Sequence, residues 1–452
     1  MTSCFRSVNT PQTRIVTLIV RYGLPAIILA FYLTAARRFA YTPDSTYSGA
    51  IAARTVAEEG AFSAGPDQSP RFSSNPLWVL FQAAGIRASI EPLLFSKVFS
   101  LFFCCMGLVL AYLVANEILD DRLLAFCATF VLAMQTWLLF LAPGGSAIPA
   151  ASTLALACIF FLLRNEYVLA SFFAGIVSLL LWEGVILFGL VMTDLVINSV
   201  RQDKVIRIAS VSFLVYAVVV VPWVIYGVRQ GVPLLTALAR LDEMPGSGIL
   251  TLASNVLLVV LAAGGIALSV KGSEWKKDLL QHVVPLLWAA ILLAWALLGR
   301  WELLPIGMPP LVILAFRGLQ RMAVSLRKEA TLYPLAFGVV ALSLLFSQIE
   351  FNIRVKPDMI SAEASAFERD AVAAWVKSNV GDSLSLAADF PGQLAYRTGK
   401  TVIAWSPGGH QDADAVVCSS DTLPGYAPAY ALQLEDIAQA GGKSITVWKK
   451  RI

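Results

Sequence analysis

The chain has 452 residues, of which 58% are hydrophobic and only 14% are charged, against about 25% charged in an ordinary soluble domain. A soluble fold cannot keep so much apolar surface away from water, so the composition excludes a soluble globular protein. The net charge of +4 comes from 34 basic and 30 acidic residues without a long basic run, which excludes a nucleic-acid partner.

Apolar segments of about 17 to 25 residues can cross the hydrocarbon core of a membrane as helices. The chain predicts such segments at residues 15–36, 92–115, 122–142, 148–164, 167–182, 185–200, 206–227, 249–270, 283–299, 303–319 and 332–349. A cleaved signal peptide ending near Ala35 is the alternative for the first segment, although signal cores are shorter, about 7 to 15 residues. The sequence therefore predicts an α-helical polytopic membrane protein with about eleven transmembrane helices.

Lysine and arginine collect in the loops that follow the even-numbered spans, and positive loops stay on the cytoplasmic side. These loops and their flanks hold Arg201, Lys204, Arg207, Lys271, Lys276, Lys277, Arg317, Arg321, Arg327 and Lys328. A cytoplasmic N-terminus, which Arg6 and Arg14 also favour, and an odd number of spans place the C-terminus outside. Three longer segments then face the extracytoplasmic side, namely the first outer loop 37–91, the loop 229–248 and the tail 350–452.

The first outer loop predicts two short helices that lie along the membrane surface. Asp44-Ser-Thr-Tyr47 opens an amphipathic segment that runs to Glu59, and Gly60 ends it. A second apolar piece begins at Phe72 and contains Trp78. This geometry holds the start of the first helix near the lipid headgroups.

Asp44 has two interpretations. It follows a proline and precedes a helical run, which is typical of a helix N-cap. It is also the leading candidate for a general base, because a base must be a carboxylate or an imidazole. The two histidines are poor alternatives, since His282 lies on the cytoplasmic flank of a span and His410 lies in the tail.

The tail predicts a small α/β domain at 350–452, separate from the membrane domain at 1–349. A helix is expected at 366–380 and strands at 383–388, 401–405, 415–418 and 444–448. Asp389-Phe-Pro-Gly392 and Ser406-Pro-Gly-Gly409 are interpreted as turns. His410, Asp412 and Asp414 are interpreted as part of a solvated loop, so no metal site is predicted.

Several short motifs follow one another along nearly the whole chain. They are Asp44-Ser-Thr-Tyr47 with Ala53-Arg54 and Ala57-Glu58-Glu59-Gly60, Ser73-Ser-Asn-Pro-Leu-Trp78, Leu181-Trp-Glu-Gly184, Gly231-Val-Pro233 through Thr236 to Arg240, and Arg300 with Leu304-Pro305 and Pro309-Pro310. Their order resembles the C-type (GT-C) glycosyltransferases, the group of protein O-mannosyltransferases, aminoarabinose transferases and arabinosyltransferases. The chain departs from the family pattern where Ser45 replaces a second acid, Trp182 replaces Arg-Pro and Arg240 replaces Lys.

The resemblance implies a sugar donor linked to polyprenyl phosphate, with its lipid tail between helices and its sugar phosphate at the outer surface. It implies an inverting single displacement in which Asp44 takes the proton of an acceptor hydroxyl. Outward-facing cations are expected at the donor phosphate: Arg300, which we prefer, Arg240, Arg54 and Arg71. The residues expected to position the sugar or the acceptor are Tyr47, Glu183 and Trp78. Snorkelling is the alternative for Arg300, and simple solvation is the alternative for Glu183.

The expected function is a hexosyl- or pentosyltransferase of the cytoplasmic membrane, with its active site and C-terminal domain on the extracytoplasmic side. Its acceptor is a glycan, a lipid or a protein. The sequence establishes no cofactor, and the resemblance leaves a divalent cation open. Two alternatives remain. One is a lipid or glycan transporter or flippase, favoured by Gly264-Gly265 and the prolines at 305–310. The other is a catalytically inactive assembly partner that has lost the second acid.

Overall fold

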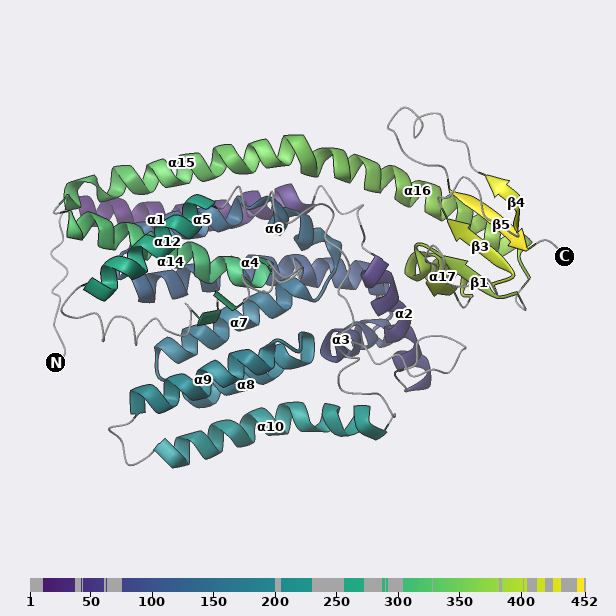
Figure 1. Cartoon of the computed structure of the whole chain (residues 1–452), viewed down its shortest axis with the longest axis horizontal. Helices are drawn as coiled ribbons and strands as arrows, with labels where there is room; N and C mark the ends of the chain where they lie inside the picture. Colours follow the sequence, from purple (N-terminus) through teal and green to yellow (C-terminus); the bar gives the residue numbers. More distant parts are fainter. Residues whose placement is uncertain are drawn as a thin grey trace.

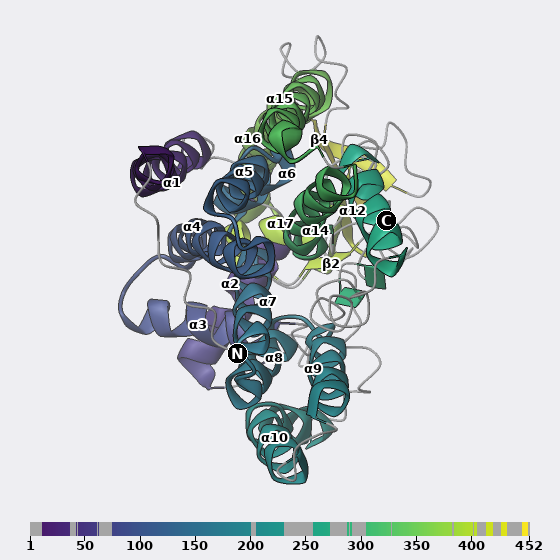
Figure 2. The same ribbon diagram turned by 90° about the vertical axis from the view of Figure 1, so that its left-hand side faces the viewer.

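A computed structural model of the chain describes residues 11–36, 42, 44–60, 62, 75–199, 205–229, 256–271, 287–288, 290–291, 304–326, 328–381, 384–400, 402–404, 413–418, 426–431 and 445–450. Its helices form an elongated bundle, and a small sheet lies beyond one end of that bundle (Figure 1). The bundle contains α1 (Pro11–Ala36), α4 (Pro92–Leu119), α5 (Arg122–Ala133), α6 (Thr136–Leu141), α7 (Ile148–Leu163), α8 (Tyr167–Leu180), α9 (Gly184–Ser199), α10 (Val205–Arg229), α12 (Val256–Lys271), α14 (Leu304–Ser325) and α15 (Leu332–Glu350). Figure 2, which looks along the bundle, shows these helices side by side.

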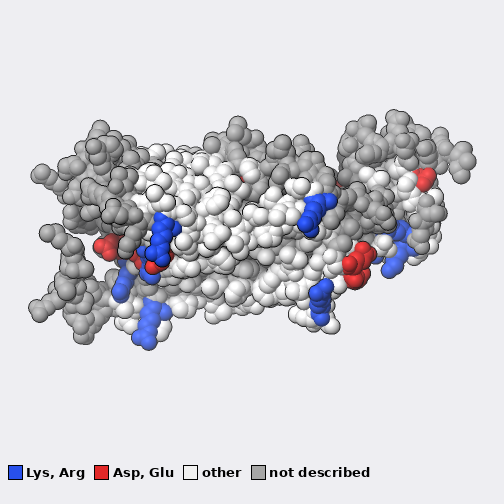
Figure 3. Space-filling model, turned by 90° about the horizontal axis from the view of Figure 1, so that it is seen from below, with Lys and Arg blue, Asp and Glu red and all other residues white. Residues whose placement is uncertain are grey.

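The surface of the bundle is that of a protein surrounded by lipid. In the described part of the chain, four helical stretches are long and apolar enough to cross a membrane: Val16–Ala36, Pro92–Leu119, Val205–Tyr226 and Leu332–Ile353. Large apolar side chains stay exposed along them, among them Ile206 (81% exposed) and Val218 (66%). On the face seen in Figure 3, the described charged side chains gather toward the two ends and leave an uncharged region between them. The chain is therefore a multi-pass membrane protein.

Every predicted span except 122–142 and 283–299 corresponds to one described helix. The prediction of a single helix at 122–142 is wrong, because α5 ends at Ala133 and α6 begins at Thr136. Gln135 between them has an extended backbone (φ −66°, ψ 126°), and this polar residue interrupts an apolar run that hydropathy alone cannot divide. Segment 283–299 lies mostly outside the described residues, and the number of helices that cross the membrane stays a prediction.

The turns that were predicted to be cytoplasmic contact one another at one end of the bundle. Arg164, which follows α7, pairs with Glu117 of α4 at 2.6 Å. Tyr333 at the start of α15 donates a hydrogen bond of 2.9 Å to Asp121. Asp121 also caps α5, because its carboxylate accepts from two backbone N–H groups of the first turn at 2.8 and 3.1 Å. These contacts bring the ends of α4, α5, α7 and α15 together, and the orientation of the bundle in the membrane stays a prediction.

The opposite end holds the two short helices of the first outer loop, α2 (Asp44–Glu59) and α3 (Pro76–Arg87), as predicted. α2 ends at the expected glycine, since Gly60 has a φ of +73° that favours glycine. Beyond it, the backbone N–H of Phe62 donates to the hydroxyl of Tyr226 near the end of α10 (3.3 Å). The ring of Phe62 packs edge-on against Trp223, with 4.8 Å between the centroids. These contacts fix the outer loop to the bundle.

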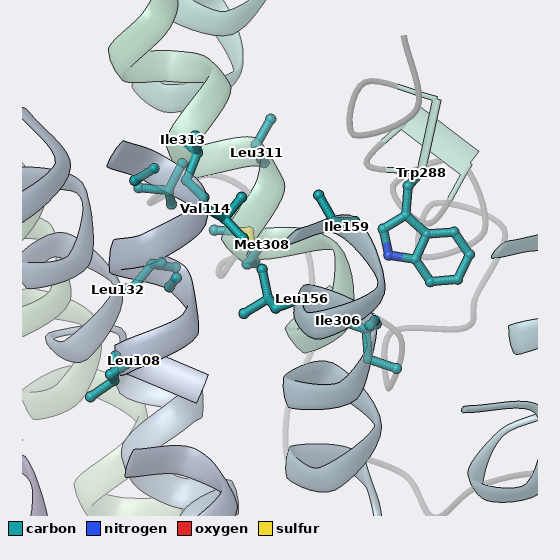
Figure 4. Close-up of a cluster of buried hydrophobic side chains, with 14 of the residues drawn as sticks. Leu108, Val114, Leu132, Leu156, Ile159, Trp288, Ile306, Met308, Leu311 and Ile313 are labelled. Carbon is teal, nitrogen blue, oxygen red and sulfur yellow. The ribbon is translucent and has the colours of Figure 1, made fainter. Parts of the chain in front are cut away.

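The core of the bundle is a continuous set of buried apolar side chains from α4, α5, α7 and α14 (Figure 4). The side chains labelled in the figure on these helices are Leu108, Val114, Leu132, Leu156, Ile159, Ile306, Met308, Leu311 and Ile313. Because lipid is as apolar as these side chains, close packing rather than removal from water stabilises their contacts. The predicted Pro309-Pro310 motif lies inside α14, so it is a helical element of this core.

α15 continues past the bundle. A π-helical turn, η5 (Phe351–Val355), leads into α16 (Lys356–Asn379), and together they form one rod from the bundle to the sheet (Figure 1). The predicted boundary at residue 350 therefore falls inside a helical rod. The helix expected at 366–380 is the second half of α16, which begins earlier than predicted.

The sheet has five described strands in the order β2-β1-β3-β5-β4. These are β1 (Leu386–Ala388), β2 (Val402–Ala404), β3 (Ala415–Cys418), β4 (Tyr426–Ala431) and β5 (Thr446–Lys450). β1 pairs in parallel with β2 and β3, whereas β5 is antiparallel to β3 and β4. β4 was not predicted, and the other four strands lie where the sequence placed them.

One face of the sheet is covered by α16 and by a short helix, α17 (Pro391–Thr398), through Val376, Phe390 and Leu394. The turn predicted at Asp389–Gly392 is wrong in its second half, because Pro391 is the first residue of α17. Proline is well suited to the first position of a helix, but Pro391 followed by Gly392 is also a common turn sequence. Only the burial of the residues that follow Pro391 shows that it begins a helix rather than a turn. We call residues 356–452 the C-terminal unit.

Candidate active site

The first turn of α2 lies where the bundle meets the C-terminal unit. The helix begins at Asp44, and the side chains of Asp44 and Ser45 lie outside the described residues. The next two side chains are buried, with Thr46 3% exposed and Tyr47 5% exposed. The hydroxyl of Thr46 donates to the backbone oxygen of Gly144 at 2.9 Å. The start of α2 is therefore fixed against the 3-10 turn η1 (Ala142–Gly144).

Gly145 brings a buried lysine next to this turn. Its φ of +78° is a conformation that favours glycine. A Cβ placed on Gly145 would lie 3.0 Å from a methyl carbon of Thr46, 3.2 Å from Cβ of Ser96 and 3.3 Å from Cγ of Lys97. Thr46 and Lys97 are thus neighbours around the glycine. Lys97 is only 8% exposed, and an ionisable residue inside a membrane helix is by default a candidate for function.

α3 packs against the turn that contains Gly145. The indole Nε1 of Trp78 donates to the backbone oxygen of Gly145 at 3.2 Å, and the side chain is 4% exposed. One turn later, the buried amide of Gln82 bonds the hydroxyl of Ser96 at 2.5 Å. Trp78 therefore packs inside the bundle, where it positions Gly145. Contact of this indole with a sugar stays a prediction.

α17 meets α2 from the side of the C-terminal unit. The Tyr396 ring lies 5.5 Å from the Tyr47 ring, and the guanidinium of Arg54 lies 4.2 Å from the Tyr396 centroid. Arg54 Nη2 donates to the Tyr396 hydroxyl at 2.9 Å, and that hydroxyl donates to Glu91 Oε1 at 2.5 Å. Burial and the hydrogen bond to Glu91 raise the pKa of Tyr396 well above its usual value. The hydroxyl is therefore a protonated donor at neutral pH.

The residue after Tyr396 also contacts α2. Arg397 makes two bonds to Asp370 of α16, at 2.9 and 2.8 Å, and Gln393 donates to the same carboxylate at 2.9 Å. The guanidinium also lies near the hydroxyl of Tyr47. Burial raises the pKa of Tyr47, while the nearby Arg397 opposes this shift.

Glu183 lies in the tight turn between α8 and α9, at the same end of the bundle as α3 (Figure 1). Its side chain is 1% exposed. It directly precedes α9, where the helix dipole favours a carboxylate. The next residue must be small, because a Cβ on Gly184 would clash with the backbone of Ser178. A solvated carboxylate, the alternative from the sequence, is wrong for this buried position, whereas a role in positioning the acceptor stays a prediction.

The structure brings some predicted site residues together and leaves others aside. Tyr47 and Arg54 lie on the helix that Asp44 begins, and Trp78 packs behind its first turn. Three of the arginines predicted at the donor phosphate lie outside the described residues: Arg71, Arg240 and Arg300. Among the described residues, no three His, Cys, Asp or Glu side chains gather as a metal site.

Three residues of the site were not predicted. Lys97 has a signal in the sequence, because it is the only charged residue within the apolar segment 92–115. Tyr396 and Arg397 have none, since they reach α2 through a tertiary contact that spans more than three hundred residues. No local pattern predicts such a contact.

Comparison with known proteins finds solved structures that have a similar fold. No protein-family profile matches the chain, and no curated protein matches it. The chain is similar to the crystal structure of ArnT from Cupriavidus metallidurans in the apo state, with a TM-score of 0.59 and 13% identity over 97% of this chain and 98% of that chain. It is equally similar to ArnT bound to undecaprenyl phosphate, with a TM-score of 0.59 and 13% identity over 94% and 97% of the two chains. The resemblance to the GT-C fold is confirmed.

Proposed function

We propose that this chain, which has the GT-C fold of ArnT, is a membrane glycosyltransferase. It transfers a hexosyl or pentosyl group from a polyprenyl-phosphate donor to a hydroxyl of a glycan, lipid or protein. One observation carries the proposal: the helix that begins at Asp44 meets the buried Lys97 around Gly145. Asp44 is an aspartate, which can accept a proton, and Lys97 is a lysine, which can bind phosphate. They thus belong to neighbouring turns of one site.

The fold and Lys97 support a lipid-linked donor. ArnT, which has the same fold, binds undecaprenyl phosphate. The tail of such a donor stays among apolar groups, while its phosphate needs a cation where the surroundings are poorly hydrated. Lys97 suits this role, because an ammonium donates strong, charge-assisted hydrogen bonds to phosphate oxygens. Further candidates for the phosphate are Arg300, Arg240, Arg71 and Arg54.

The proposed reaction is a single displacement. Asp44 takes the proton of the acceptor hydroxyl while that oxygen attacks the anomeric carbon. The bond between this carbon and the phosphate oxygen breaks, so the configuration at the carbon inverts. Polyprenyl phosphate leaves as an anion whose developing charge Lys97 stabilises. Tyr47 and Glu183 position the acceptor or the sugar.

We place this chemistry on the outer face of the cytoplasmic membrane. The end of the bundle opposite α2 carries the arginines Arg122, Arg164, Arg207, Arg317 and Arg321. Basic ends of membrane helices are retained in the cytoplasm, which supports an outward orientation for α2. The C-terminal unit, which we predicted from residue 350 and which begins at residue 356, then lies outside the membrane as a small α/β domain.

A catalytically inactive assembly partner is the second candidate. Ser45 favours it, because the GT-C family commonly has a second acid at this position. Such a protein would bind the donor without turning it over.

The test is transfer by the purified protein in lipid vesicles, with a panel of polyprenyl-phosphate sugars and release of polyprenyl phosphate as the readout. Wild type is compared with Asp44→Asn and with Glu58→Gln, a matched control that removes an exposed acid from the same helix. We expect release by wild type and by Glu58→Gln but not by Asp44→Asn. Equal release by all three proteins contradicts the Asp44 mechanism. Binding of a donor without release supports the inactive partner, and absence of both favours a transporter.

A further inference from the structure

We propose that Tyr396 of α17 is a positioning residue for transfer: from the C-terminal unit, it fixes the first turn of α2 and thereby the place of Asp44. This proposal rests on the proposed function. It assigns to the C-terminal unit a direct part in the geometry of the membrane-embedded site.

One hydroxyl group joins three helices. The Tyr396 hydroxyl accepts a hydrogen bond from Arg54 of α2 (2.9 Å) and donates one to Glu91, the residue that caps α4 (2.5 Å). Glu91 uses its other oxygen for the backbone N–H of Leu94 in the first turn of α4 (2.6 Å). The distance between α2 and the start of α4 is therefore set by a side chain of α17. Lys97 lies on the same helix, α4, about one turn after Leu94.

The ring of Tyr396 acts on the first turn directly. It packs on Tyr47 with 5.5 Å between the centroids, and Tyr47 is 5% exposed. Asp44 begins the turn of α2 that contains Tyr47, so a contact that fixes Tyr47 also fixes the backbone at Asp44. The adjacent Arg397 is held by Asp370 with two bonds, and its charge acts on Tyr47. A rotation or shift of the first turn would break these contacts together.

α2 needs such support from outside. It has 16 residues, and most of the stability of a helix in a protein comes from tertiary packing rather than from its own propensity. On the bundle side, the described hydrogen bond that fixes its first turn is that of Thr46 with Gly144. α17 contacts the turn from the other side, so the two contacts hold α2 between the bundle and the C-terminal unit.

The consequence for transfer is a change in turnover rather than in donor binding. A misplacement of 1 Å at a reacting group lowers the rate by about 100-fold. Tyr396→Phe keeps the ring on Tyr47 but removes both hydrogen bonds of the hydroxyl. We therefore expect kcat to fall by about 10- to 100-fold. The KM for the donor should change less than kcat, because Lys97, the main cation assigned to the donor phosphate, lies on α4 and not on α2.

The experiment compares wild type, Tyr396→Phe and Tyr333→Phe in vesicles. Tyr333→Phe is the matched control, because it also removes a tyrosine hydroxyl that is bonded to a carboxylate, but at the opposite end of the bundle. Kinetics gives kcat and the KM for the donor, and thermal unfolding tests whether both variants are folded. Hydrogen exchange of peptides from 44–59 and 76–87 reports on α2 and α3 without any need for activity.

The proposal is supported if Tyr396→Phe lowers kcat more than it changes the KM for the donor and speeds exchange in 44–59 but not in 76–87, while Tyr333→Phe does neither. Unchanged exchange in 44–59, or unchanged kcat despite faster exchange, overturns it. A loss of kcat shared by both variants also overturns it, because the effect is then general. If wild type transfers nothing while exchange in 44–59 still responds to Tyr396→Phe, the proposed function has failed and the contact between α17 and α2 stands.

Discussion

Replacing Lys97 by methionine should slow transfer. The side chain is 8% exposed, and methionine keeps the length of its apolar stem while removing the charge. A hydrogen bond to a charged group contributes about 1.5 to 3 kcal/mol. If Lys97 binds the phosphate of the donor, kcat/KM for the donor should therefore fall by about 10- to 150-fold. Thermal unfolding separates this loss of rate from any change in stability.

The assay is the initial rate of polyprenyl phosphate release over a range of donor concentrations, together with thermal unfolding in the same lipid. Lys328→Met is the control, since Lys328 is an exposed lysine between α14 and α15 at the other end of the bundle. An unchanged kcat/KM in Lys97→Met would refute the assignment of Lys97 to the phosphate. A parallel fall in melting temperature and rate would also refute it, because Lys97 would then be structural.

Three further variants test the surroundings of the site. Gly145→Ala should lower the melting temperature, because a positive φ disfavours alanine by about 1 kcal/mol and its Cβ would lie within 3.3 Å of three side chains. Arg54→Gln and Tyr396→Phe should together lower the transfer rate by less than the product of their separate effects, since both break one hydrogen-bond network. If the two effects multiply instead, Arg54 acts independently of Tyr396, as expected of a phosphate ligand. Glu183→Gln should raise the KM for the acceptor and leave the KM for the donor unchanged, which two-substrate kinetics can measure.

The fold could be predicted where one signal dominated the local sequence. Long apolar segments gave the helices, and the start at Asp44 and the stop at Gly60 gave the bounds of α2 within the outer loop. The prediction failed where a weak local signal decided the outcome. Gln135 divides α5 from α6 inside an apolar run, and Pro391 opens α17 although it is followed by glycine.

The site was predicted only in part, for a different physical reason. Residue type and order made Asp44 the candidate base, which stays a prediction, but the residues that contact its helix come from distant parts of the chain. Lys97 could have been found, since a lone charge in an apolar span requires an explanation. Tyr396 could not, because its contacts with Arg54 and Glu91 depend on how the C-terminal unit packs on the bundle.

The serine at position 45 bears on whether the protein is active. A displacement at an anomeric carbon needs one group that removes a proton from the acceptor and one group that stabilises the leaving phosphate. Asp44 and Lys97 are the residue types for these two tasks, and they belong to adjoining turns around Gly145. A second acid next to Asp44 would place another negative charge near the phosphate and weaken the effect of Lys97 on it. Ser45 alone is therefore compatible with transfer, and the decision between an enzyme and an inactive partner depends on Asp44 and Lys97.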